Sequence, residues 1–168
     1  MKNEYISYPA IIEEIRRETL DTKTFRLRFK DKKIGEAFTY KQGQFMEVSV
    51  LGAGEAPISI TSSPSRLGFL ELTIRAAGRV TKAIHSLSTG DCVYLRGPYG
   101  NAFPFEEIKG KNIYFVAGGI GLAPLRSLIN LVFDNRKDFK HIKILYGSKS
   151  ADDLCFKDEL EKLKKMLD

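Results

Sequence analysis

Cysteine, histidine and tryptophan are scarce in this sequence of 168 residues, which has two cysteines, two histidines and no tryptophan. The two cysteines, Cys92 and Cys155, are too few for a small disulfide-stabilised scaffold, and a protein-held iron–sulfur cluster normally needs four. We therefore predict no metal site in the chain itself. The N-terminal region also lacks the apolar core of a signal peptide, so the reducing cytoplasm is the expected location.

Long hydrophobic runs and blocks of like charge are missing as well. The longest weakly charged stretch, residues 112–133, contains Pro124, Arg126 and three glycines, so it predicts a strand, a turn and a helix rather than a membrane span. The 27 Lys and Arg residues exceed the 21 Asp and Glu residues by 6, but they are interleaved with acids. This mixed-charge pattern argues against nucleic-acid binding, and the 43% of hydrophobic residues suffice for a packed core.

The first part of the chain has the two-residue period of half-buried strands. The clearest alternating segments are residues 25–30, 46–50 and 70–75. Turn-forming residues separate them at regular spacing, which predicts a small antiparallel barrel with one helix at about residues 80–87. We assign residues 1–100 to this unit and expect Phe25, Phe29 and Phe45 to fill its interior.

The period changes after Gly97-Pro98-Tyr99-Gly100, which we interpret as a turn. The elements predicted next are a strand at residues 112–117, a helix around 125–133 and a strand at 141–146. A second helix is expected to be capped by Asp152 or Asp153, and its apolar face comprises Phe156, Leu160, Leu163 and Leu167. The order of strand, helix, strand and helix predicts parallel strands with right-handed crossovers.

Residues 101–168 therefore form a Rossmann-like unit that is incomplete. Two parallel strands make a poor independent sheet, because parallel sheets are normally covered on both faces and have several paired strands. We expect the missing strands to come from a longer polypeptide or from another chain.

A glycine-rich turn joins the first strand of this second unit to its helix. Glycines in that position let the backbone approach a pyrophosphate, and the helix N-terminus offers free N–H groups. The sequence is G-x-G-x-x-P rather than the usual G-x-G-x-x-G or A, and a proline is tolerated in a first helical turn. A tight turn without a ligand is the alternative. The candidate dinucleotide-binding residues are Gly118, Gly119, Ile120, Gly121, Ala123 and Pro124.

A second candidate anion site precedes the helix of the barrel. It combines a glycine turn, a cation and a hydroxyl at the start of a helix. The alternative is that Thr81 simply caps that helix. The candidate residues are Gly78, Arg79, Val80 and Thr81.

A third candidate binding site, for a planar ring, lies in residues 56–64, an apolar segment with clustered hydroxyls. An extended strand here can place Ile58 against a planar ring while Ser59 donates a hydrogen bond to a ring nitrogen. An ordinary strand that ends in a serine-rich turn explains the same residues.

Five motifs in this order resemble the ferredoxin-NADP reductase superfamily. The motifs are Gln42-Gly43-Gln44-Phe45, Pro57-Ile58-Ser59-Ile60, Gly78-Arg79-Val80-Thr81, Gly97-Pro98-Tyr99-Gly100 and the glycine turn at residues 118–124. More narrowly, the chain is similar to flavin-bearing electron-transfer subunits: the gamma subunit of soluble hydrogenase or sulfhydrogenase, the B subunit of anaerobic sulfite reductase, and the electron-transfer subunit of dihydroorotate dehydrogenase.

The resemblance implies a six-stranded antiparallel FAD-binding barrel followed by a truncated NAD(P)-binding domain. Pro57, Ile58, Ser59 and Ile60 match the flavin-binding strand of the family. Ser59 then lies by the flavin N5, and Ile58 replaces the aromatic residue that commonly packs on the ring. Ala56 stands where the family has an arginine for the pyrophosphate. Thr73, Arg75 and Arg79 are further candidates for FAD binding, the two arginines as the nearest basic substitutes.

The resemblance also implies an NAD(P)H-linked flavoprotein oxidoreductase that passes electrons through FAD to an iron–sulfur partner. The expected partners are iron–sulfur subunits or hydrogenase and reductase subunits, and a [2Fe–2S] cluster is expected in the full-length protein or a partner but not in this chain. No catalytic side chain is predicted, since the cofactors supply the chemistry. Lys149 favours NADP over NAD because it can meet a 2′-phosphate, but NAD stays open.

Two alternatives belong to other classes of protein. One is a non-catalytic barrel that docks onto a larger redox complex, and the other is an oligonucleotide-binding barrel.

Overall fold

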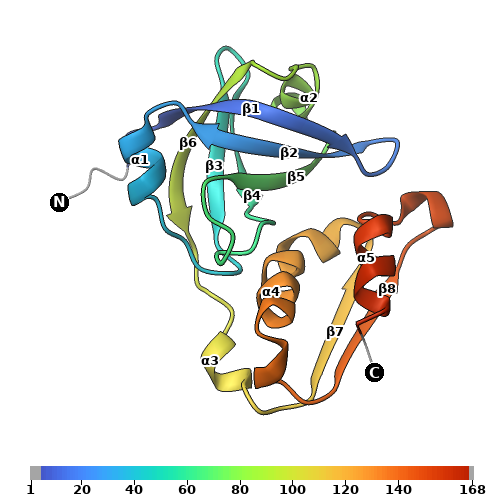
Figure 1. Ribbon diagram of the computed structural model, residues 1–168. Coiled ribbons are helices and arrows are strands. Elements are labelled where there is room, and N and C mark those ends of the chain that lie inside the picture. The colour runs from blue at the N-terminus through green and yellow to red at the C-terminus, as the bar shows by residue number, and fades with distance from the viewer. Residues whose placement is uncertain (1–4, 167–168) are drawn as a thin grey trace.

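The computed structural model describes residues 5–166 and divides into a barrel and a smaller α/β unit (Figure 1). The strands of the barrel are β1 (Tyr8–Arg17), β2 (Thr22–Phe29), β3 (Phe45–Val50), β4 (Gly54–Ser59), β5 (Leu70–Arg75) and β6 (Cys92–Tyr99). They pair antiparallel in the order β4-β3-β6-β1-β2-β5. An isolated bridge between Ile60 and Leu72 joins the two outer strands. The prediction of a six-stranded antiparallel barrel is confirmed.

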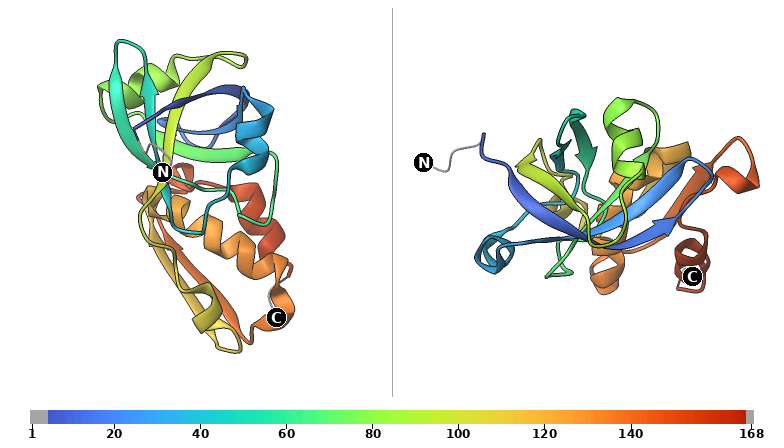
Figure 2. Two further views of the ribbon diagram at one scale, coloured as in Figure 1. Left: turned by 90° about the vertical axis from the view of Figure 1, so that its left-hand side faces the viewer. Right: turned by 90° about the horizontal axis from the view of Figure 1, so that it is seen from above.

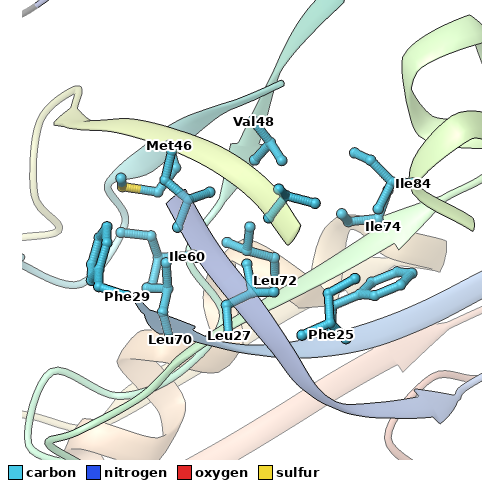
Figure 3. Packing of buried hydrophobic residues seen from close by; sticks show 14 residues of the cluster. Phe25, Leu27, Phe29, Met46, Val48, Ile60, Leu70, Leu72, Ile74 and Ile84 are labelled. Carbon is cyan, nitrogen blue, oxygen red and sulfur yellow. The ribbon is translucent and has the colours of Figure 1, made fainter. Parts of the chain in front are cut away.

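Alternation along the strands produces the core of the barrel. Apolar side chains from all the strands and from α2 (Arg79–His85) point inward and pack together, as Figure 3 shows for Met46, Leu72 and Ile84. Phe25 and Phe29 are buried there as expected. Phe45 differs, because it is only partly buried and packs against Tyr99 with 5.8 Å between the ring centroids.

The sequence predicted one helix in this unit, and the structure has two in the part of the unit that it describes, from residue 5 onward. The predicted helix at about residues 80–87 is α2. The unpredicted α1 (Lys32–Ala37) covers six residues and is capped by Asp31, whose carboxylate accepts a hydrogen bond from the Lys33 amide at 2.8 Å. Six residues with an internal glycine carry too little periodicity to be recognised as a helix.

The segment at residues 97–100 was predicted as a turn, and this prediction is wrong. Strand β6 continues through Gly97 and Pro98 to Tyr99, which pairs with Phe45 of β3, and the Gly97–Pro98 peptide bond is cis. Gly97 has φ of +133°, and a Cβ at this residue would lie 3.1 Å from Met46 Sδ. The glycine is therefore needed for close strand packing rather than for a reversal of the chain.

The second unit, here called the nucleotide lobe, has the predicted order of strand, helix, strand and helix. Its main elements are α3 (Phe105–Ile108), β7 (Ile113–Gly118), α4 (Leu122–Asp134), β8 (Ile142–Gly147) and α5 (Lys157–Lys164). Short 3₁₀ turns connect them at η1 (Gly119–Gly121), η2 (Arg136–Asp138) and η3 (Ala151–Asp153). Strands β7 and β8 pair in parallel from Ile113 opposite Ile142 to Gly118 opposite Gly147.

One face of this two-stranded sheet is covered and the other is open. Phe115 packs with α4 and α5 in a second core that is separate from the core of the barrel, and Figure 2 shows both helices beneath the barrel. On the opposite face, Tyr114, Val116 and Leu145 are 61%, 68% and 50% exposed. The structure thus retains an uncovered apolar surface on a parallel sheet.

The prediction that Asp152 or Asp153 caps α5 is wrong. Those residues form η3, and α5 starts after Phe156, which has φ of +60° and whose amide donates to Glu18 in the barrel at 2.9 Å. The cap comes from a residue distant in sequence, so no local pattern could predict it. Leu160 and Leu163 face the core of the lobe as expected, and Leu167 lies outside the described residues.

No helix within residues 5–166 combines the length and the apolar character that crossing a bilayer requires.

Candidate functional site

The strand β4 presents its predicted residues in different environments. Pro57 is exposed, Ile58 is half-buried and packs against the core of the barrel, and Ile60 is fully buried. Ser59 is partly exposed, and its hydroxyl has no hydrogen-bond partner within residues 5–166. Ser59 is therefore the member of this motif whose polar group is free to meet a ligand, whereas the side chain of Ile60 is closed off in the core.

Thr73 is also closed off from the surface. It is buried on β5, and its hydroxyl shares hydrogen bonds with the hydroxyls of Thr24 at 2.9 Å and Thr61 at 3.3 Å. These bonds hold β5 to β2 and to the segment after β4. Direct contact of the Thr73 side chain with a cofactor would require this cluster to open.

The start of α2 combines a local cap with open space. The Thr81 hydroxyl accepts hydrogen bonds from the amides of Ala77 at 3.0 Å and Gly78 at 2.9 Å, and it donates to the Gly78 carbonyl at 3.1 Å. Thr81 thus organises the turn, as the capping alternative expects. A Cβ built at Gly78 meets nothing within 4 Å, so the turn borders open space.

Strand β4 connects the two barrel motifs, and the segment from Ser59 along β4 to the start of α2 is here called the strip. A Cβ at Gly54, where β4 begins, would lie 3.5 Å from the guanidinium of Arg79, so α2 sits beside this end of β4. Ser59 is at the other end of the strand, about 17 Å away at the usual rise per residue. Arg75 ends β5 and leads into the same turn.

The two arginines on this strip differ in their surroundings. Arg75 lies near Asp21, whose pKa is lowered by hydrogen bonds from Thr22 and Thr19 and by the charge of Arg75. Arg79 is exposed and forms no ion pair among the described residues. Arg79 is therefore the freer cation for an anionic ligand.

The glycine turn of the lobe opens at the carboxyl ends of both parallel strands. Gly118 and Gly147 are opposite each other in the register. A Cβ at either residue, or at Gly119 or Gly121, would meet nothing within 4 Å. No side chain caps the start of α4 in the described part of the chain, and η1 runs directly into it, with the Leu122 amide donating to the Gly119 carbonyl. The turn offers the unfilled backbone surface that a diphosphate needs.

The other members of this motif support the turn. Ala123 is buried in the core of the lobe, Ile120 packs against that core, and Pro124 occupies the first turn of α4. The Tyr146 hydroxyl donates to the Gly119 carbonyl at 2.9 Å and accepts from the Cys155 amide at 3.1 Å, and burial raises the pKa of Tyr146. Sequence reasoning missed Tyr146 as a support of the turn, although it is a polar aromatic residue at the end of an apolar strand.

A buried ionic network between the two units was also missed. Glu71 of β5 is 3% exposed and Arg126 of α4 is 6% exposed, and their charged groups are 2.7 Å apart. Arg16 and Arg26 contact the other carboxylate oxygen of Glu71 at 2.9 Å and 3.0 Å. Burial acts to raise the pKa of Glu71, but the positive charges of Arg126 and Arg16 prevail and lower it to about 2.

An antiparallel barrel is followed by a parallel strand, a glycine turn and a helix, which is the order of elements expected for a FAD-binding barrel and an NAD(P)-binding domain. The family comparison agrees: the model of the oxidoreductase FAD-binding domain matches residues 9–103, and that of the oxidoreductase NAD-binding domain matches residues 115–168. The chain belongs to this family of FAD- and NAD-binding oxidoreductases, and the superfamily predicted from its motifs is confirmed.

The related proteins include electron-transfer subunits. Sulfhydrogenase 2 subunit gamma of Pyrococcus furiosus is 46% identical over 158 residues, which cover 94% of this chain and 54% of that protein. A probable dihydroorotate dehydrogenase B electron transfer subunit of Methanopyrus kandleri is 36% identical over 155 residues, covering 92% of this chain and 54% of that protein. The chain thus spans about half the length of the curated relatives it matches.

Solved structures support the fold. The FAD/NAD-binding domain of nitric oxide dioxygenase from Vibrio cholerae has a TM-score of 0.83 at 20% identity, over 95% of this chain and 70% of that chain. Ferredoxin-NADP⁺ reductase from Plasmodium falciparum has a TM-score of 0.77 at 22% identity, over 95% of this chain and 66% of that chain.

Proposed function

We propose that this chain is the FAD- and nicotinamide-binding part of an electron-transfer oxidoreductase that acts as a subunit of a larger enzyme. The observation that carries the proposal is the pairing of two open phosphate-type turns, at Gly78 and at Gly118–Gly121, on two units that match FAD- and NAD-binding domains. FAD bound to these residues would supply the chemistry of hydride acceptance and single-electron transfer. The residues of the chain bind and orient the cofactors and exclude water.

The strip on the barrel is the FAD site in this proposal. Ser59, with its free hydroxyl, is proposed to donate a hydrogen bond to the flavin N5, and the exposed part of Ile58 and Pro57 to border the ring. The backbone amides of Arg79 and Val80, which have no acceptor inside α2, are proposed to bind the diphosphate together with the Arg79 guanidinium. This cation replaces the arginine that the family has at Ala56.

The lobe is proposed to hold the nicotinamide dinucleotide at Gly118–Gly121. The open space around Gly118, Gly119 and Gly121 supports this assignment. Lys149, which is exposed just beyond β8, favours a 2′-phosphate and therefore NADP. The uncovered apolar face of β7 and β8 supports the proposal that further strands and helices complete the lobe in the whole protein.

The electron acceptor is proposed to be an iron–sulfur centre, in a partner subunit or elsewhere in a longer protein. The similarity to a sulfhydrogenase gamma subunit and to dihydroorotate dehydrogenase electron transfer subunits supports partners of the hydrogenase or reductase type. We propose the cytoplasm as the location, since both cysteines are free thiols.

Flavin reconstitution tests the proposal. The purified chain is incubated with FAD, freed of unbound flavin by gel filtration, and assayed by absorbance between 350 and 500 nm, a range chosen for the oxidised flavin bands. About one FAD per chain is expected, and Arg79→Ala should weaken FAD binding by about tenfold through loss of a charge-assisted hydrogen bond. Lys82→Ala, on the exposed side of the same helix, is the matched control. A folded chain that retains no flavin would favour the non-catalytic docking module.

A further inference from the structure

One guanidinium group, that of Arg126, bonds to both the barrel and the nucleotide lobe. Arg126 Nη1 donates to Glu71 Oε2 at 2.7 Å and to the Thr61 carbonyl at 3.2 Å, both in the barrel. Its Nε and Nη2 donate to Glu159 of α5 at 2.9 Å and 2.7 Å. Arg126 thus bonds to both units at once, and all of its nitrogens are used.

The place of Arg126 in the fold connects the two candidate cofactor surfaces. Arg126 lies one helical turn after Leu122, where α4 leaves the glycine turn. Thr61, whose carbonyl it binds, follows Ser59 by two residues along the chain that continues from β4. A shift of Arg126 relative to Thr61 would therefore move the glycine turn relative to Ser59.

The network admits few alternative arrangements. One oxygen of Glu71 is held by Arg16 and Arg26 and the other by Arg126, and the Arg126 guanidinium lies over the Phe156 ring, 4.9 Å from its centroid. A planar guanidinium with fixed donor directions bonds in few orientations. Buried polar networks whose members are all satisfied specify one arrangement of the groups around them.

We propose that Arg126 and Glu71 are positioning residues that fix the orientation of the nucleotide lobe on the barrel. A consequence, which rests on the proposed function, is that they set the separation between the nicotinamide and the flavin. Neither residue touches the reacting atoms. Their effect is transmitted by α4 to the glycine turn and by the segment after β4 to Ser59.

Another ion pair between the two units lies at the surface and serves as a comparison. Arg66 and Asp134 are 3.1 Å apart, but their side chains are 43% and 30% exposed. Exposed pairs of this kind fix geometry weakly because water competes for both groups. The proposal therefore predicts that the buried pair, and not this one, determines the orientation.

Distances between spin labels test the orientation directly. One nitroxide is attached to Cys92, the exposed thiol of the barrel, and a second to Lys137→Cys in the lobe, with Cys155→Ala to remove the buried thiol. Double electron–electron resonance then reports the distribution of distances between the two units. The labelled parent should give one narrow distribution.

The test variant is Glu71→Met with Arg126→Met. Apolar replacement of both partners avoids an unpaired charge in the interface, so the variant is expected to fold. Arg16, Arg26 and Glu159 remain partly exposed and can be hydrated. The distance distribution should broaden about twofold or more, because interdomain motion is the default without a specific interface. Arg126→Lys should give an intermediate width, since an ammonium cannot bridge Glu71, Thr61 and Glu159 together.

Two matched controls complete the measurement. Arg28→Gln breaks an ion pair with Glu13, 2.7 Å long, whose two residues both belong to the barrel. Arg66→Gln breaks the exposed ion pair between the two units. Both should keep the narrow distribution. An unchanged distribution in the folded double-Met variant, or equal broadening in Arg66→Gln, would overturn the proposal.

Flavin reduction separates this proposal from the proposed function. With FAD bound, the double-Met variant should retain the flavin content of the parent but be reduced by NADPH or NADH about tenfold to a hundredfold more slowly, since small misplacements of reacting groups have effects of this size. Reduction at the rate of the parent would overturn the positioning role. If the flavin of the parent is not reduced at all, the proposed function fails, while the label distances still decide the question of orientation.

Discussion

The barrel and the nucleotide lobe differ in how completely the edges and faces of their sheets are covered. The barrel joins its outer strands through the Ile60–Leu72 bridge and fills its interior with apolar side chains. The lobe covers one face of two parallel strands and leaves Tyr114, Val116 and Leu145 exposed on the other. The comparison teaches that the barrel is a self-contained scaffold for one cofactor, whereas the lobe depends on contacts outside its own sheet, including those with the barrel.

The largest expected difference is between the free energies of unfolding lost when a leucine is truncated in the sheet of the barrel and in the sheet of the lobe. Leu72→Ala removes a fully buried side chain from the barrel and should lower the free energy of unfolding by about 2–5 kcal/mol. Leu145→Ala truncates a half-exposed leucine on the open face of the lobe. This substitution should change the free energy of unfolding by less than about 0.5 kcal/mol. Urea unfolding followed by circular dichroism measures both. Equal losses would mean that the open face is covered in solution.

Acid should weaken the contact between the two units. The pKa of Glu71 is about 2 in the folded protein and 4.5 ordinarily, so its contribution to stability is fully present above pH 4.5 and is lost as the pH falls toward 2. The loss is on the order of 3 kcal/mol. Glu71→Gln should flatten this part of the stability–pH profile, measured by urea unfolding between pH 2 and pH 6. Glu106→Gln, at an exposed carboxylate, should keep the slope of the parent.

The N-terminal caps of α2 and α4 also differ, and the expected effect on the free energy of unfolding is smaller. The turn before α2 is held by the Thr81 hydroxyl, whereas no side chain caps α4 within the described residues. Thr81→Val should lower the free energy of unfolding by about 1 kcal/mol, and Thr81→Ser should restore most of it. Thermal unfolding of the two variants gives the comparison. Equal stability of the Val and Ser variants would show that the hydroxyl does not hold the turn.

The smallest effect is expected on the open face itself. Val116→Ser should change the free energy of unfolding by less than about 0.5 kcal/mol, because the side chain is already largely exposed. Urea unfolding of Val116→Ser beside the parent measures the difference. A clear loss of stability would indicate a packing partner for Val116 that the structure does not include.

Sequence patterns predicted the elements whose signals are local. Alternation at residues 46–50 and 70–75 predicted β3 and β5, and the apolar run before Gly118 predicted β7. The patterns failed where a distant residue decides the structure. Asp152 and Asp153 were predicted to cap α5, but Glu18 of the barrel accepts the Phe156 amide instead.

The candidate site was predictable to a similar degree. The glycine turns and Ser59 were identified from residue types that leave the backbone or a hydroxyl available, and the structure leaves them facing open space or without a partner. Thr73 and Ile60 were also candidates for cofactor binding, but tertiary packing buries them. Glu71 lies on the outward face of β5, where exposure is expected, and only the docking of α4 turns it into a buried ion-pair partner.

Hydrogen–deuterium exchange with and without FAD tests the central claim most directly. If FAD lies along the strip from Ser59 to Arg79, its addition should slow amide exchange in residues 57–62 and 78–82 and leave residues 142–147 of β8 unchanged. Slowing confined to the lobe, or no change in either barrel segment at saturating FAD, would contradict the account.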